Sequence, residues 1–193
     1  DLTLDSSARQ SLVVTAREEA DRLNRLVGNL LDMTRLESGA LQVKREPCDV
    51  QDLIGAALGQ MEDRLMERQI GVEVSPDLPL VDLDFVLIVH VLMNLLDNAL
   101  KYSPDNSPLD IRASQHYGEI QVAVMDRGIG IPSEDLSRVF DKFYRVQRPV
   151  QVTGTGLGLA ISKGIIEAHG GRIWASEREG GGTVITFALP LDV

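Results

Sequence analysis

Apolar and polar residues recur with helical spacing along residues 7–38, a stretch with no proline and with Gly28 as its only glycine. Ser7 with Gln10 resembles a capping box, and Gly39 stands where a helix would stop. The pattern predicts a helix of about 30 residues, roughly 45 Å long. Its apolar stripe steps by threes and fours: Leu12, Ala16, Ala20, Leu23, Val27, Leu30, and Met33 or Thr34.

A helix of this length is longer than the rest of so small a chain can cover. We therefore expect part of the stripe to pack against a partner helix. The alternative is that the helix folds back onto its own domain.

After Gly39 the pattern changes to shorter elements, and we expect Asp82 or Asp84 to cap the third helix. Helices interleaved with hairpin strands predict an α+β fold, a two-layer α/β sandwich with helices on one face of a mixed sheet. We place a helical segment at 1–40 and a second domain at 41–193. The expected elements are a strand and turn at 41–50, helices at 50–68, 84–102 and 157–169, and strands at 70–75, 109–115, 119–126, 172–177 and 182–190.

Residues 127–156 are rich in glycine, proline and charge, and they predict little regular structure. A loop of about 30 residues is uncommon in a compact domain unless it has a function. We interpret this stretch as a lid.

Composition and net charge argue against several classes of protein. A hydrophobic content of 44% and a charged content of 25% are ordinary for a globular protein. The net charge of −10 argues against nucleic acid as a partner, because that role needs a basic surface. Cys48 is the one cysteine, so an intrachain disulfide is excluded. The apolar runs, such as 85–89, are far shorter than the roughly 20 residues of a membrane helix.

The predicted 84–102 helix carries polar residues beside its apolar face. His90, Asn94, Asn98 and Lys101 form a stripe about a quarter turn away from that face. This stripe is either a solvated edge or one wall of a ligand site. The apolar arc, which should face the sheet, comprises Ile88, Val91, Leu92, Leu95, Ala99 and Tyr102.

Asp126 ends the apolar row of the 119–126 strand, where Gly128 and Gly130 allow a tight turn. A carboxylate accepts hydrogen bonds only, so it suits an exocyclic amine such as that of adenine. The alternative is an aspartate that caps the turn.

The stretch 154–164 places glycines at alternate positions directly before a helix. Free backbone N–H groups and the helix dipole can hold phosphate there. The pattern is neither a Walker A loop nor a dinucleotide fingerprint, because Leu159 stands where the latter needs glycine. By itself such a turn is weak evidence for a phosphate site.

Together a carboxylate, amides, a lysine and glycine turns fit one ligand, Mg-ATP, since carboxamide oxygens suit Mg²⁺. The lid would bring cations toward the terminal phosphate, although its aromatic residues could also just anchor an amphipathic turn. Its candidate residues are Phe140, Lys142, Phe143, Arg145 and Arg148.

With these motifs in order, the chain resembles a sensor histidine kinase of two-component signalling, with a catalytic domain of the GHKL (Bergerat) ATP-binding fold. Residues 26–50 resemble the last helix of the family's dimerisation and phosphoacceptor hairpin. The sequence of residues 140–145 and 165–175 is most similar to the potassium-sensing KdpD branch. The matching motifs are NLLDNALKY (N box), DRGIGIP (first glycine box), FDKFYR (F box), GTGLGLAI (second glycine box) and GGTVITFALP (closing strand).

The resemblance implies ATP and Mg²⁺ as cofactors and gives each motif a role. Asn98 would ligate Mg²⁺, with Asn94 beside the metal. Lys101 and Tyr102 would contact the phosphate and ribose, and Arg145 the γ-phosphate. Asp126 would receive the adenine amine. The base end would also include Gly128, Gly130, Ile131 and Thr183, and the phosphates would be lined by Gly154, Thr155, Gly156, Leu157 and Gly158.

Asn94 bears on the reaction. By the resemblance, relatives that hydrolyse ATP carry a glutamate here as general base on water. An amide cannot take a proton, whereas an imidazole nitrogen is already a nucleophile and needs only positioning. Asn94 therefore favours transfer to histidine over hydrolysis.

No histidine of this chain matches the family's acceptor motif, because His90, His116 and His169 are followed by Val, Tyr and Gly. We expect the acceptor on an upstream helix, in a homodimeric kinase that is anchored in the inner membrane of a bacterium and passes phosphate to a response regulator. This piece would be cytoplasmic. The alternatives are a GHKL-type ATP hydrolase and a nucleotide-binding pseudokinase module.

Overall fold

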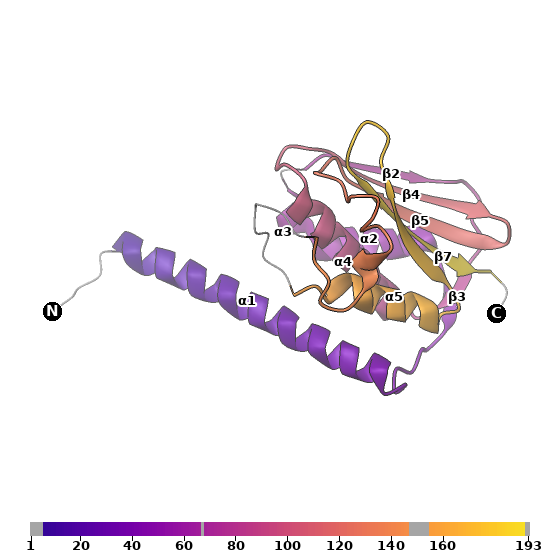
Figure 1. Ribbon diagram of the computed structural model, residues 1–193, viewed down its shortest axis with the longest axis horizontal. Coiled ribbons are helices and arrows are strands. Elements are labelled where there is room, and N and C mark those ends of the chain that lie inside the picture. The colour runs from indigo at the N-terminus through magenta and orange to yellow at the C-terminus, as the bar shows by residue number, and fades with distance from the viewer. Residues whose placement is uncertain (1–5, 67, 147–154, 192–193) are drawn as a thin grey trace.

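A computed structural model describes residues 6–66, 68–146 and 155–191. A mixed sheet of five strands, ordered β2-β4-β5-β7-β6, is covered on one side by helices, as the sequence predicted (Figure 1). Strand β2 is parallel to β4, and the remaining pairs are antiparallel. The strands are β2 (Ile70–Val74), β4 (Leu109–His116), β5 (Glu119–Met125), β6 (Arg172–Glu177) and β7 (Thr183–Pro190).

The helical layer packs on the sheet through alternating strand residues that face it. On β5, Ile120, Val122 and Val124 are buried, and they meet the apolar side of the central helix. The helices of this layer are α2 (Val50–Gln60), the short α3 (Glu62–Leu65), α4 (Phe85–Tyr102) and α5 (Gly158–Ala168).

A second, two-stranded sheet lies beside this layer. It pairs β1 (Glu46–Cys48) with β3 (Val81–Leu83) in antiparallel fashion. The predicted strand at 41–50 is confined to β1, and β3 was not foreseen because three residues give too short a pattern. Asp82 lies in β3, so the cap of α4 is Asp84, whose Oδ1 accepts from Leu87 N at 3.1 Å.

The predicted 50–68 helix is broken at Met61, whose backbone angles of −109° and 9° are not helical. Beyond the break Arg68 turns toward the end of α4, with a side chain only 5% exposed. It donates to Ser103 Oγ at 3.1 Å and to the carbonyls of Ser103 and Leu100. Arg68 thus satisfies carbonyls that the helix end leaves open.

Helix α4 is apolar enough, by length and composition, to cross a membrane. Its apolar face is instead buried in the core of the described chain, where Ile88, Val91, Leu92, Leu95 and Ala99 pack as predicted. Tyr102 was expected on the same face but is 36% exposed. The helix ends there, and Ser103 takes the buried position, with Oγ donating to Ala99 O at 2.5 Å.

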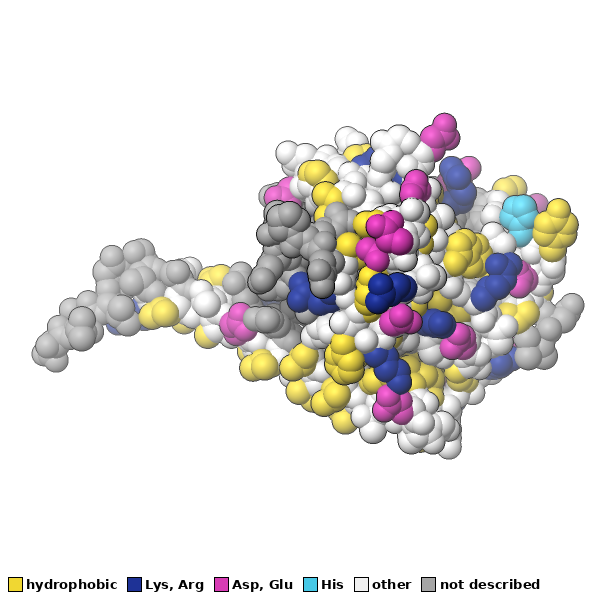
Figure 2. Space-filling view, viewed as in Figure 1, with side chains coloured by type: hydrophobic (Ala, Val, Ile, Leu, Met, Phe, Trp, Pro, Cys, Tyr) yellow, Lys and Arg dark blue, Asp and Glu magenta, His cyan; other side chains and the backbone are white. Residues whose placement is uncertain are grey.

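Helix α1 (Ser6–Glu37) is one long helix whose far end extends away from the rest of the molecule (Figure 1). The predicted start at Ser7 is one residue late, and the side chain of Ser7 is outside the described part. Near its end Met33 is buried and Leu36 contacts Gly164 of α5. Apolar side chains stay uncovered along the preceding turns (Figure 2), among them Leu12, Val13, Val14, Leu23, Leu26, Val27, Leu30 and Leu31.

Candidate functional site

The polar side of α4 holds the first group of predicted residues. Asn94 and Asn98 are half-buried, and Asn94 Nδ2 is buried with no hydrogen-bond partner in the described structure. A buried amide without a partner costs free energy, so such a group calls for a ligand. Asn94 Oδ1 lies at the start of α5, 3.7 Å from where a Cβ on Gly158 would be.

Lys101, about one turn beyond Asn98 on α4, forms an ion pair with Asp97. Asp97 was not among the residues that the sequence analysis selected. Asp97 also pairs with Arg64 of α3. Burial alone would raise the pKa of Asp97, but the hydrogen bond and charge of Lys101, with the charge of Arg64, bring the pKa below its usual value. Asp97 is therefore an anion that fixes Lys101 beside the asparagines. The i, i+4 spacing between Asp97 and Lys101 is the sequence feature that could have revealed this pair.

Asp126 directly follows β5 and is 7% exposed. Its Oδ1 accepts from Gly128 N at 2.7 Å and from Thr183 N at 3.2 Å. The turn-capping interpretation is therefore correct for Oδ1. A carboxylate offers about four lone-pair positions, so these two bonds leave capacity for a ligand amine.

The pKa of Asp126 lies above its ordinary value because burial disfavours the charged form. The backbone N–H groups of Gly128 and Thr183 and the positive charge of Arg178 oppose that shift. Asp126 is thus a desolvated carboxylate whose charge depends on its neighbours.

The first glycine loop is tied to α4 through backbone atoms. Ile129 N donates to Tyr102 O at 3.2 Å, and a Cβ at Gly128 would lie 2.2 Å from the same oxygen. Gly130 has a φ of 70°, and a Cβ at that position would lie 3.5 Å from Gly182 O. Only glycine fits at position 128 without a shift of the backbone.

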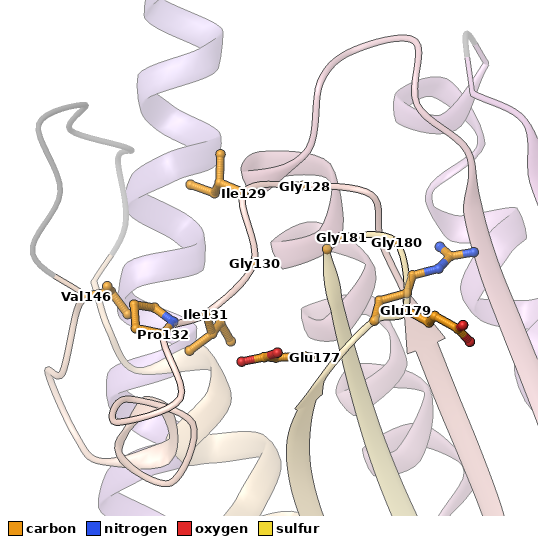
Figure 3. Close-up of a pocket in the computed structure, with 12 residues that line it drawn as sticks. Gly128, Ile129, Gly130, Ile131, Pro132, Val146, Glu177, Glu179, Gly180 and Gly181 are labelled. Atoms are coloured by element: carbon orange, nitrogen blue, oxygen red, sulfur yellow. The ribbon is translucent and has the colours of Figure 1, made fainter.

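This loop and the β6–β7 turn border a pocket of about 900 Å³. Figure 3 shows the Glu177 carboxylate directed toward Ile131 and Pro132. Neither the asparagines of α4 nor Asp126 is among the residues that line this pocket. Its lining is Gly128, Ile129, Gly130, Ile131, Pro132, Val146, Glu177, Arg178, Glu179, Gly180, Gly181 and Gly182.

The second glycine loop runs into α5, as predicted. Thr155 Oγ1 accepts from Leu157 N at 3.3 Å, and Leu157 is buried. Gly156 has a φ of 70°, and its carbonyl accepts from Phe143 N at 3.0 Å. That bond joins the loop to the F box. Gly154 and Arg148 lie outside the described residues.

The lid segment contains one 3₁₀ turn, η1 (Arg138–Phe140), within its described part. Phe140 is buried and anchors the turn, whereas Phe143 is 67% exposed with a φ of 61°. Lys142 pairs with Glu37 of α1 at 2.5 Å, rather than with α4 or α5. Arg145 is exposed. The structure therefore brings the F box to the second glycine loop but leaves these two cations on the outside.

A metal ion could not be held here by acidic and histidine ligands alone, since the described residues contain no cluster of three such side chains. Mg²⁺ needs fewer protein ligands, because it retains waters and binds substrate phosphates. The half-buried amides of Asn94 and Asn98 fit that kind of site.

Comparison with known proteins identifies the family to which this fold belongs. The family described as histidine kinase-, DNA gyrase B-, and HSP90-like ATPase matches residues 83–193, more than half of the chain. Solved structures share the fold. The mycobacterial sensor histidine kinase MprB has a TM-score of 0.67 and 31% identity, over 76% of this chain and 97% of MprB. The chain belongs to this family and carries the catalytic domain of a sensor histidine kinase.

Two longer structures also match the helix. Full-length ShkA in complex with AMPPNP has a TM-score of 0.80 and 30% identity, over 97% of this chain and 40% of ShkA. ThkA in complex with the response regulator TrrA has a TM-score of 0.77 and 25% identity, over 97% of this chain and 53% of that one.

Among curated relatives, the sensor histidine kinase WalK of Bacillus subtilis (strain 168) is 40% identical over 191 residues, covering 95% of this chain and 31% of WalK. The sensor protein KdpD of Clostridium acetobutylicum is 33% identical over 192 residues, covering 98% and 21%. The chain thus spans a third or less of these relatives. Because both names occur, the similarity does not single out the potassium-sensing branch.

Proposed function

We propose that this chain binds Mg-ATP and transfers the γ-phosphate to a histidine on a helix upstream of the present sequence. The observation that carries the proposal is the unpartnered Asn94 amide, buried where α4 meets the start of α5. It lies on the same helix whose last residue, Tyr102, holds the first glycine loop. One helix therefore links a phosphate-type turn to the Asp126 carboxylate.

Adenine would lie at the Asp126 end. The exocyclic amine would donate to the carboxylate, and Gly128 leaves the loop close to the end of α4. Thr183 N fixes the carboxylate from the other side. Gly130 and Ile131 border the same end of the site.

The phosphates would lie between α4 and the second glycine loop, which lines them with Gly154, Thr155, Gly156, Leu157 and Gly158. Asn98 would ligate Mg²⁺ and Asn94 would sit beside it; the bound ion would offset negative charge on the phosphates. Lys101 would exchange part of its pairing with Asp97 for phosphate oxygens, with Tyr102 near the ribose. Arg145 would approach the γ-phosphate from the lid.

Transfer rather than hydrolysis follows from the amide at position 94. Asn94 can orient a group but cannot remove a proton from water. A histidine acceptor needs no general base, because its unprotonated nitrogen is already a nucleophile. The domain then has only to hold the phosphate in line with that nitrogen.

The acceptor would come from the other helix of an antiparallel hairpin. The uncovered apolar side chains of α1 offer the surface for that helix and for a second copy of the chain (Figure 2). A response regulator would take the phosphate onward, as the complex of ThkA with TrrA suggests by analogy. In the longer protein this part would be cytoplasmic, attached to a sensor in the inner membrane.

The test mixes this chain with a separate hairpin that carries the upstream acceptor histidine, in the presence of Mg²⁺ and γ-labelled ATP. We expect an acid-labile phosphoprotein on the hairpin and little release of phosphate without it. Appreciable turnover in the absence of the hairpin would indicate a hydrolase. Binding of ATP with no transfer would indicate a pseudokinase.

A further inference from the structure

Arg178 follows β6 directly, yet its guanidinium forms an ion pair with Asp110 of β4. In the sheet β7 and β5 lie between these two strands. Asp110 is in register with Met125, the residue before Asp126. The side chain of Arg178 therefore reaches across the end of the sheet where β5 gives way to Asp126.

The charge of Arg178 is desolvated and only partly offset. Its side chain is 13% exposed, and Nη1 is buried without a hydrogen-bond partner in the part of the chain that the structure describes. A charge removed from water acts more strongly on its neighbours than one at the surface. Asp110 is more exposed, at 35%, and so more of its charge is screened by solvent.

The backbone of the same hairpin connects Arg178 to residues that contact Asp126. Arg178 N donates to Gly182 O at 3.2 Å. One residue further, Thr183 N donates to Asp126 Oδ1 at 3.2 Å, and Asp126 N donates to Thr183 O at 2.9 Å. A Cβ on Gly182 would lie 2.1 Å from Asp126 O. The turn is therefore in direct contact with the Asp126 backbone.

We propose that Arg178 is a positioning residue for base recognition, which holds the Asp126 carboxylate ionised and in place from the far side of the β6–β7 turn. The inference rests on the proposed binding of adenine at Asp126. It assigns a role to a residue that no motif in the sequence singled out.

Other charged groups face this region. Arg127 donates to Glu179 O at 2.9 Å and so is directed to the hairpin. Lys101 of α4 is paired with Asp97. The largest influence on Asp126 is burial, which raises its pKa, and Arg178 opposes burial. Three acidic residues lie near Arg178 itself: Asp110 of β4, which pairs with it, and Glu177 and Glu179, which flank it in the hairpin.

The experiment measures the affinity of the chain for Mg-ADP by calorimetry between pH 5 and pH 8, for the wild type and for Arg178→Gln. Without the guanidinium, Asp126 takes up a proton at higher pH, and a protonated carboxyl is a poorer acceptor. We expect equal or slightly weaker binding at pH 8 and about three-fold weaker binding than wild type near pH 5.5, the scale of a partly screened charge.

Arg172→Gln is the matched control. Arg172 is the first residue of β6, the strand that Arg178 follows; it pairs with Glu119, and its guanidinium carbon lies 4.7 Å from the centre of the Trp174 ring, toward the opposite end of the sheet. We expect it to keep the wild-type pH profile. Arg178→Lys, which keeps the charge, should restore most of the profile, and Arg178→Met replaces Arg178→Gln if the latter fails to fold.

A parallel pH profile for the folded Arg178 variants would overturn the inference while leaving the proposed function intact. A loss of affinity of the same size at every pH would also overturn it, since that result indicates a structural role alone. Failure of the wild type to bind Mg-ADP would overturn both.

Discussion

The two ends of the proposed nucleotide site are held by different kinds of interaction. At the base end backbone hydrogen bonds fix each part: Gly128 and Thr183 hold Asp126, and Tyr102 holds the glycine loop. At the phosphate end the cations are engaged elsewhere, Lys101 with Asp97 and Lys142 with Glu37.

The difference teaches that the base end is preformed, whereas the phosphate end must exchange partners when a ligand binds. Backbone bonds within a buried turn are costly to break. The Lys142–Glu37 pair joins two exposed side chains, and such pairs contribute little and exchange readily; in the Lys101–Asp97 pair Asp97 is largely buried, whereas the lysine reaches solvent. Substitutions at the base end should therefore act on affinity, and those at the phosphate end on transfer.

The largest effect is expected for Asn98→Ala, which removes the proposed metal ligand. Transfer to the acceptor hairpin should fall by about 100-fold or more, as when a group that acts at the reacting phosphate is lost, while circular dichroism shows a folded domain. The control is Asn106→Ala in the exposed turn after α4. Unchanged transfer by Asn98→Ala would remove Asn98 from the metal site.

Asp126→Asn should weaken ATP binding by about 1.5–3 kcal/mol, the usual contribution of a hydrogen bond to a charged group. This corresponds to roughly 10- to 150-fold in the dissociation constant, measured by calorimetry. Asp135→Asn, in the lid beside Tyr144, is the control. Equal affinity for wild type and Asp126→Asn would show that the base does not lie at this carboxylate.

Gly128→Ala and Gly158→Ala compare the two ends directly. A Cβ at Gly128 would lie 2.2 Å from Tyr102 O, whereas one at Gly158 would lie 3.7 Å from Asn94 Oδ1. We expect Gly128→Ala to destabilise the domain by about 1–3 kcal/mol, the cost of overpacking, and Gly158→Ala to be accommodated. Thermal unfolding measures both. Equal destabilisation would mean that the two ends are equally rigid.

Acid should destabilise the contact between the end of α5, at His169, and the start of α4, at Asp84. His169 Nε2 accepts from Asp84 N at 3.0 Å, so the proton is on Nδ1, 2.7 Å from Ile165 O. Burial lowers the pKa of His169 in the folded state, with the Ile165 bond opposing. The unfolded state therefore binds the proton first, and stability is lost as the pH falls through about 6.5, by up to about 1.4 kcal/mol per pH unit.

Urea unfolding at pH 7.5 and pH 5.5 measures this loss. In His169→Gln, the part of this loss of stability that comes from protonation of His169 should disappear. In His116→Gln, at the exposed end of β4, it should persist. An unchanged slope in His169→Gln would assign the acid sensitivity to other groups.

The smallest effect is expected for Lys142→Ala. The pair with Glu37 is about half exposed on both sides, so its loss should cost less than about 1 kcal/mol. A double-mutant cycle with Glu37→Ala isolates the coupling, and Lys163→Ala is the control. A coupling as large as the effect of Asp126→Asn would contradict a loosely held lid.

Much of the fold could be predicted from local patterns of apolar residues in the sequence. Ile120, Val122 and Val124 alternate on β5 because one face of the sheet is buried, and the α4 stripe was placed because a core helix needs one apolar side. The errors occur at element ends. Tyr102 is exposed because the helix ends there, and the 50–68 helix breaks at Met61, beyond which Arg68 contacts the residue that follows α4.

By itself the sequence determined the order of motifs and the residue types available for chemistry, since glycine turns and helical periodicity depend on neighbouring residues. Only the tertiary structure decided that Tyr102 O holds the glycine loop, that Lys142 pairs with Glu37, and that Arg178 reaches Asp110 across two strands. Such contacts join segments far apart in the chain, and their geometry depends on how the sheet and helices pack rather than on any local pattern.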